Sequence, residues 1–298
     1  RKRKIIIEKD SLNNPSKKAK VFKYKSINLS CQNIKDEYLK NYADYTTIDL
    51  SKCINITDLG LKHLKAVQNI NLGDTNITDS GLANLPKSLK KITLNNTNVS
   101  GHTLKELKSV TYINLSECHK ITDQTLCNLS KTLTELDLSN CDTITNQGLS
   151  NLPKSIKILN LNSFQKITIK TLKILQNLNN LYELNLNHTS ISNTSLKYLP
   201  NKLKNLKLFS CEKINDSGLK NLPSTLTHID LGGSNKITHN GLANLPDTIT
   251  HIDISYSHLS YIAPSKLPKS LKEIQAASGY NFKEIQNALK DTKIIVRD

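Results

Sequence analysis

The chain has 298 residues, with 41 lysines and arginines against 25 acidic residues and a formal net charge of +16. Aromatic residues make up only 5%, and methionine and tryptophan are absent, so leucine and isoleucine must supply the core. No apolar run approaches the ~18 residues that cross a bilayer, and no signal peptide is visible, so no transmembrane segment is predicted. Because the sequence starts at Arg1 without a methionine, we expect it to be a fragment whose natural N-terminus lies upstream.

Residues 1–23 form the first predicted segment, a basic N-terminal tail or cap. They hold nine lysines or arginines against Glu8 and Asp10. The triplet Ile5-Ile6-Ile7 can add one strand, and the rest is expected to be solvated. The basic clusters at 1–4 and 17–20 suit a nuclear import signal, a tether to anionic membranes or a plain charged tail. The sequence leaves these alternatives open.

Residues 24–275 repeat a unit of 21 to 25 residues about twelve times. Positions one, four and six of each unit are apolar, position nine is small or cysteine, and a Leu-x-x-Leu stretch follows. The units start at Tyr24, Tyr45, Val67, Leu89, Val110, Leu133, Ile156, Leu181, Leu203, Leu226, Ile249 and Leu271. Such a period is typical of a solenoid. We therefore predict an α/β fold, a right-handed leucine-rich-repeat horseshoe with a parallel concave sheet and short convex helices.

Each repeat predicts its own local structure. Alternation around positions three to five indicates a half-buried strand, and the leucine spacing after position nine indicates a short helix. Threonines can cap the helix starts with their side-chain oxygens, at Thr57, Thr78, Thr122, Thr145 and Thr238. Leu-Pro pairs such as 85–86 and 152–153 end six of these helices. Residues 276–298 are predicted to form a C-terminal cap, with a helix over 282–289 and a strand over 293–296.

Six cysteines could suggest disulfides, but their positions argue against them. Four occupy position nine of their repeats, namely Cys53, Cys118, Cys141 and Cys211. Threonine or serine fills the same position elsewhere, so it requires a small, weakly polar group. Free buried thiols predict a reducing compartment and a cytoplasmic protein, with the nucleus or a host cytosol as further possibilities. Cys127, outside this register, is expected to pack on a helix.

The motif Cys-x-x-Ile-Thr-Asp-x-Gly-Leu resembles the cysteine-containing leucine-rich repeat. Residues 53–61, 118–123 and 141–146 carry it, and 79–82 and 216–219 repeat its second half. The resemblance implies the substrate-receptor role of F-box proteins in ubiquitin ligases. Two departures stand beside it. No F-box-like helical segment lies between Arg1 and the repeats, which leaves open one encoded upstream of Arg1, and the Leu-Pro-x-Ser-Leu joint at 85–89 is similar to repeats of bacterial effectors and protists. A host-targeting effector is therefore the other implied role.

The repeat register also predicts where charge lies. Positions three, five, seven and eight should face the concave side, where three lysines (Lys52, Lys91 and Lys207) meet nine acidic residues. The acidic residues are Asp49, Asp74, Glu117, Glu135, Asp137, Glu183, Asp230, Asp253 and Glu273. A DNA backbone would be repelled there, so nucleic acid is not expected on this face. A protein partner is predicted instead, and a basic patch on that partner would complement these acidic residues.

Departures from the short polar pattern of this face cluster late in the array and predict the partner-binding residues. They are Lys207, Phe209, His228, Asp230, His251, Asp253 and Tyr256. Aromatic and charged residues grouped on a polar surface are typical of interaction hot spots. The stacked His-x-Asp pairs could also hold Zn²⁺, although adjacent repeats produce such pairs by coincidence.

Catalytic signatures are absent: the sequence holds no His-Glu-x-x-His, glycine-rich phosphate loop or Gly-x-Ser-x-Gly. We therefore expect no enzyme and no cofactor. The leading hypothesis is a non-enzymatic protein-binding scaffold. The alternative is a nucleic-acid or anionic-membrane binder that acts through the basic tail and convex lysines.

Overall fold

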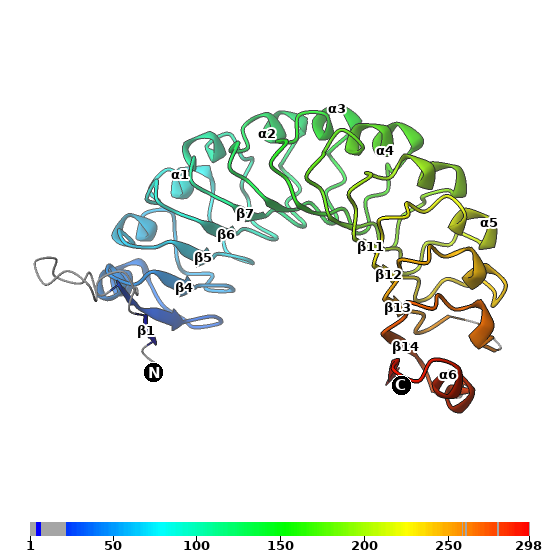
Figure 1. Ribbon diagram of the computed structural model, residues 1–298. Coiled ribbons are helices and arrows are strands. Elements are labelled where there is room, and N and C mark those ends of the chain that lie inside the picture. Colours follow the sequence, from blue (N-terminus) through cyan, green and yellow to red (C-terminus); the bar gives the residue numbers. More distant parts are fainter. Residues whose placement is uncertain (1–3, 7–21, 258, 260, 279, 298) are drawn as a thin grey trace, which may run out of the picture.

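The computed structural model describes residues 4–6, 22–257, 259, 261–278 and 280–297. Its main feature is one parallel sheet of thirteen strands in chain order, which lines the inside of an arc (Figure 1). The strands are β3 (Ser26–Asn28), β4 (Thr47–Asp49), β5 (Asn69–Asn71), β6 (Lys91–Thr93), β7 (Tyr112–Asn114), β8 (Glu135–Asp137), β9 (Ile158–Asn160), β10 (Glu183–Asn185), β11 (Asn205–Lys207), β12 (His228–Asp230), β13 (His251–Asp253), β14 (Glu273–Ala277) and β15 (Lys293–Arg297). The predicted horseshoe is confirmed.

Short helices cover the outer side of the arc (Figure 1). The α-helices are α1 (Asp79–Leu82), α2 (Asp123–Cys127), α3 (Asn146–Leu149), α4 (Ile169–Leu175), α5 (Asp216–Leu219) and α6 (Phe282–Ala288). The 3-10 helices are η2 (Asp36–Tyr42), η3 (Gly60–His63), η4 (Leu104–Glu106), η5 (Asn193–Tyr198), η6 (Gly241–Asn244) and η7 (Pro264–Lys266). Between sheet and helices runs one continuous layer of buried leucine and isoleucine.

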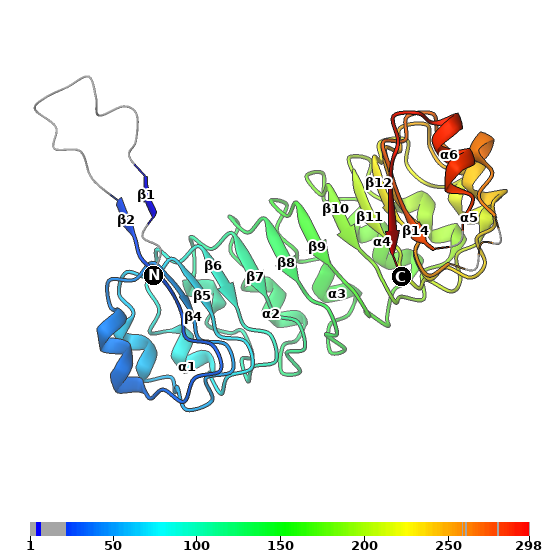
Figure 2. The ribbon, with the colours of Figure 1, turned by 90° about the horizontal axis from the view of Figure 1, so that it is seen from below.

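The two ends of the sheet differ from the predictions in one respect each. The strand expected from Ile5-Ile6-Ile7 exists as β1 (Lys4–Ile6), but it pairs antiparallel with β2 (Phe22–Tyr24) outside the main sheet (Figure 2). At the other end, the helix and strand expected after residue 276 form α6 and β15. Since β15 pairs in register with β14, it adds a thirteenth row, with Lys293 and Arg297, to the concave face.

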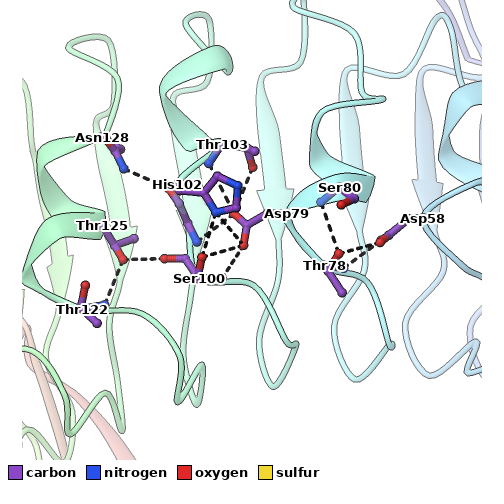
Figure 3. Close-up of polar contacts among 11 residues, drawn as sticks. Asp58, Thr78, Asp79, Ser80, Ser100, His102, Thr103, Thr122, Thr125 and Asn128 are labelled. Carbon is purple, nitrogen blue, oxygen red and sulfur yellow. Dashed lines mark hydrogen bonds and ion pairs between the residues drawn. The ribbon is translucent and has the colours of Figure 1, made fainter.

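A carboxylate of one repeat holds the helix start of the next repeat. Asp58 accepts hydrogen bonds from the Thr78 backbone nitrogen (2.9 Å) and hydroxyl (2.6 Å), as Figure 3 shows. Thr78 in turn accepts from Ser80 N and caps α1, as predicted. A Cβ at Gly81 would collide with the Asp58 carboxylate, which explains the glycine of the motif. The Thr-Asp-x-Gly pattern therefore joins neighbouring repeats through this contact of the aspartate carboxylate with the next repeat.

The same carboxylate contact between repeats is most buried at Asp79, which is 6% exposed. Its carboxylate accepts hydrogen bonds from backbone and hydroxyl groups of Ser100 and Thr103 and from Gly101 N, at 2.7 to 3.4 Å (Figure 3). Burial alone would raise the pKa of Asp79, but the hydrogen bonds from Ser100 and Thr103 outweigh it and lower this pKa.

All six cysteines are free thiols, as the sequence predicts. Those at position nine are buried, and each donates to a leucine carbonyl of the previous repeat, as Cys118 Sγ does to Leu94 O at 3.0 Å. Burial raises the pKa of Cys141 to about 12. The packing role expected for Cys127 is wrong, because α2 holds this side chain on its solvent side.

Candidate functional site

The concave face is built on a turn that follows each strand. In nine repeats an asparagine or aspartate at position five accepts a hydrogen bond from the backbone nitrogen two residues later. These residues are Asn28, Asp49, Asn71, Asn114, Asp137, Asn160, Asn185, Asp230 and Asp253. A side chain at position five thus has a structural task, and only its other terminal atom, an oxygen in aspartate or an amide nitrogen in asparagine, can face a ligand.

Position eight takes a left-handed backbone conformation in repeat after repeat. Ten non-glycine residues have φ between 51° and 61°, among them His188 and Tyr256, and Gly233 has φ 62° at the same position. In most of these repeats the nitrogen at this position donates to a carbonyl of the next repeat, as His188 N does to Phe209 O at 2.8 Å. The strained conformation therefore extends the hydrogen-bond ladder past the strand and directs position eight to the rim of the sheet.

The seven residues predicted as a site lie together at the C-terminal end of the arc, on β11 to β13 and the turns that follow. Lys207 occupies position five and has no acceptor to close its own turn. Its ammonium group pairs with Glu183 of β10 at 3.0 Å. Asn187 of the previous repeat accepts from Phe209 N instead, at 2.8 Å. The turn is thus held from outside, which frees Lys207 to face the concave side.

Three rings meet beside this turn. Phe209 contacts His188 edge-on with centroids 5.3 Å apart, and contacts Tyr256 edge-on at 6.2 Å. A Cβ at Gly232 would lie 2.7 Å from the Phe209 ring, so this ring lies over the glycine of the next repeat. Tyr256 is 56% exposed. The sequence prediction missed His188, although its place at position eight beside Phe209 could have indicated it.

The two predicted histidines stack face to face on β12 and β13, which pair them in register. Their rings are 4.1 Å apart and 9° from parallel. Each Nδ1 lies within hydrogen-bond distance of the preceding threonine hydroxyl, 2.9 Å for His228 and 2.8 Å for His251. Burial is the main cause that lowers the pKa of His228, and the neighbouring His251 lowers it further. The negative charges of Glu183 and Glu273 act in the opposite direction and raise this pKa, but they do not outweigh the first two.

A shallow hollow of about 300 Å³ opens at these rings, between Glu183 and Glu273. Asp230, Asp253, Lys207, Gln275 and Arg297 are among the residues that line it. Burial raises the pKa of Asp230, and the charge of Asp253 adds to this, while Gly232 N, Lys207 and Arg297 oppose it. A larger hollow of about 720 Å³ lies between η7 and residues 288–292, away from the concave strands.

The zinc hypothesis fails on geometry. Within the described residues, no three or more histidines, cysteines and acidic residues converge as metal ligands. The polar lining residues that the predicted site left out are Glu183, Asn205, Glu273, Gln275 and Arg297. Of these, Arg297 lies on β15, the thirteenth strand, which follows the repeats.

Comparisons with known proteins agree on the repeat. The sequence model of the Leucine Rich repeat family matches residues 129–152. Among solved structures, an internalin (InlF) of Listeria monocytogenes matches with a TM-score of 0.57 and 22% identity, over 94% of this chain and 86% of that one. A comparison with curated protein sequences finds no match. Neither the family model nor the internalin structure concerns F-box proteins, so that part of the resemblance stays a prediction. No helix in the described ranges has the length and apolar content to cross a bilayer.

Proposed function

We propose that this chain, a leucine-rich-repeat solenoid, is a non-enzymatic scaffold that binds a protein partner on its concave face. One observation carries the proposal: rings and charged groups gather over β10 to β14, while short polar side chains cover most of the earlier strands. Solenoids use such extended concave surfaces for binding, and clustered aromatic residues supply most of the energy of an interface.

The test uses substitutions that the array itself supplies. Serine occupies position seven in other repeats, and asparagine occupies the left-handed position eight at Asn96 and Asn140. The double variant Phe209→Ser, Tyr256→Asn should therefore fold normally and lose the anchoring rings. Tyr112→Ser removes a ring from the same face on β7 and is the matched control.

The measurement is affinity capture from an extract of the source cells, followed by mass spectrometry. We expect wild type and Tyr112→Ser to recover the same proteins and the double variant to lose them. Equal recovery by all three would contradict the site. Capture that disappears at moderate salt or after nuclease treatment would instead favour nucleic acid, whose binding falls steeply with salt.

Two finer roles are part of the proposal, a substrate receptor of an F-box-type ubiquitin ligase and an effector that acts on host proteins. Both draw on the resemblance of the repeats, and the free buried thiols suit their cytoplasmic location. An F-box encoded upstream of Arg1 in the full reading frame would support the first role. A secretion signal there would support the second.

A further inference from the structure

The hollow between Glu183 and Glu273 contains acceptors without donors. Elsewhere in the position-five row an asparagine satisfies the second carboxylate oxygen of its neighbour. Asn28 donates to Asp49 at 3.2 Å and Asn160 donates to Asp137 at 2.8 Å. Asp230 and Asp253 lie side by side instead, with Lys207 and Gln275 as their outer neighbours.

Neither outer neighbour donates to the two carboxylates. Lys207 Nζ bonds to Glu183, and Gln275 Nε2 bonds to Glu273 at 3.2 Å. The remaining oxygen of Gln275, Oε1, is shielded from solvent and has no hydrogen-bond partner. Across β12 to β14 the described structure therefore presents two carboxylate oxygens that a donor from outside can satisfy, beside the buried and unpartnered Oε1 of Gln275.

The charge of the hollow favours a cationic donor. Four carboxylates line it, against Lys207 and Arg297 as cations. Lys207 is already paired with Glu183, and Lys293 outside the lining is paired with Glu273 at 3.0 Å. The stacked imidazoles add a flat surface beside the carboxylates, and His228 favours its neutral form because its pKa is lowered.

Resting on the proposed function, we infer that this hollow docks a protein segment that inserts an arginine side chain. A planar guanidinium group can donate to two carboxylates on neighbouring strands, ~4.8 Å apart, and can lie against an aromatic ring. A lysine ammonium offers a point charge without the planar fork and is the weaker fit. A metal ion would lack the ligands, as described above for the same residues.

The experiment measures binding of small probes to the full chain by NMR of its histidine rings. The probes are N-acetyl-arginine amide, N-acetyl-lysine amide and N-acetyl-citrulline amide, the last being a neutral isostere of arginine. The test variant is Asp230→Asn, Asp253→Asn. Asparagine closes the same turn at Asn71, Asn114 and Asn185, so the fold should persist while both charges are lost. The matched control, Asp49→Asn, Asp137→Asn, removes two charges from the same position on β4 and β8.

We expect the arginine probe to shift the resonances of His228 and His251, with lysine weaker and citrulline without effect. The test variant should bind the arginine probe at least about tenfold more weakly than wild type does. The control variant should bind it as tightly as wild type does. No saturable shift with arginine, an equal shift with citrulline, or unchanged binding by the test variant would overturn the inference. If the test variant still captures the partners that Phe209→Ser, Tyr256→Asn loses, the binding face stands and the arginine site falls.

Discussion

Aspartates do different work on the two sides of this solenoid. At the start of the convex helical segments, Asp58 and Asp79 are surrounded by donors of the next repeat. On the concave strands, Asp230 and Asp253 each accept one backbone hydrogen bond and keep a second oxygen for the hollow. The difference teaches that an identical side chain becomes structural or available for binding according to the donors that the adjacent repeat supplies.

The pKa directions agree with this contrast. Several hydrogen bonds overcome the effect of burial at Asp79 and lower its pKa. At Asp230 burial prevails, with the help of Asp253, and the pKa is raised. A carboxylate with a lowered pKa stabilises the fold in its charged form, whereas one with a raised pKa is held there at a cost. The array tolerates that cost at Asp230, which is the behaviour expected of a binding group.

The largest effect should follow from removal of the buried convex carboxylate. Asp79→Ala leaves the donors of Ser100, Gly101 and Thr103 without an acceptor, so we expect a loss of about 3 kcal/mol in the free energy of unfolding. Urea unfolding followed by circular dichroism measures it. Asp142→Ala, at an exposed aspartate, is the control and should stay within about 0.5 kcal/mol of wild type.

The difference in the free energy of unfolding between wild type and Asp79→Ala should also depend on pH. Because the pKa of Asp79 is lowered, its stabilisation is complete above the ordinary value of 3.8 and is lost as pH falls through the folded-state pKa. Wild type and Asp79→Ala should therefore converge in acid. A gap that is unchanged in acid would show that the lost contacts, and not the charge, hold the loop.

A second substitution, at Gly81, tests the contact between the Asp58 carboxylate and the next repeat. Alanine normally stabilises a helix relative to glycine, but at Gly81 its Cβ would collide with the Asp58 carboxylate. We expect Gly81→Ala to cost about 2 kcal/mol in wild type and clearly less in an Asp58→Ala background. Urea unfolding of the four proteins in this cycle measures the coupling. Equal costs in both backgrounds would mean that the two positions do not contact each other.

The repeat fold could be predicted well from the sequence because each repeat specifies its own strand and helix locally, and the same pattern recurs about twelve times. Apolar positions one, four and six fix the strand and its register, and the Thr caps and Leu-Pro stops fix the helix between strands. The cap of α1 by Thr78 and the free thiols at position nine follow from the same regularity. What a single repeat specifies, the pattern predicts.

Contacts between repeats were harder to predict. The reason for glycine in Thr-Asp-x-Gly lies in the carboxylate of the previous repeat, as Gly81 and Asp58, 23 residues apart, illustrate. Arg297 reaches the hollow only because β15 continues the sheet after a helix that interrupts the repeat. The pattern is visibly broken at Lys207, Phe209, Tyr256 and the two histidines, whereas Gln275 occupies a strand that the pattern accepts.

Substitution of Arg297 tests the concave aspartates with a smaller expected effect, a change in the affinity of the hollow for the arginine probe. This arginine lines the hollow, and its charge opposes the rise in the pKa of Asp230, so it competes with an arginine from a partner. We expect Arg297→Gln to bind N-acetyl-arginine amide about threefold more tightly than wild type does. Lys202→Gln, an exposed lysine away from the hollow, controls for the loss of one positive charge. Weaker binding by Arg297→Gln would show that Arg297 positions the ligand.

The smallest effect concerns the stacked imidazoles. Burial and His251 lower the pKa of His228, so proton NMR should show His228 titrating below the ordinary value of 6.5. A folded state that disfavours the charged ring loses stability as pH falls through 6.5, because the unfolded chain takes up the proton first. His251→Asn removes the second contribution and should move the His228 pKa part of the way back towards 6.5. A pKa that does not move would assign the whole shift to burial, and the stacked pair would then be two independent rings.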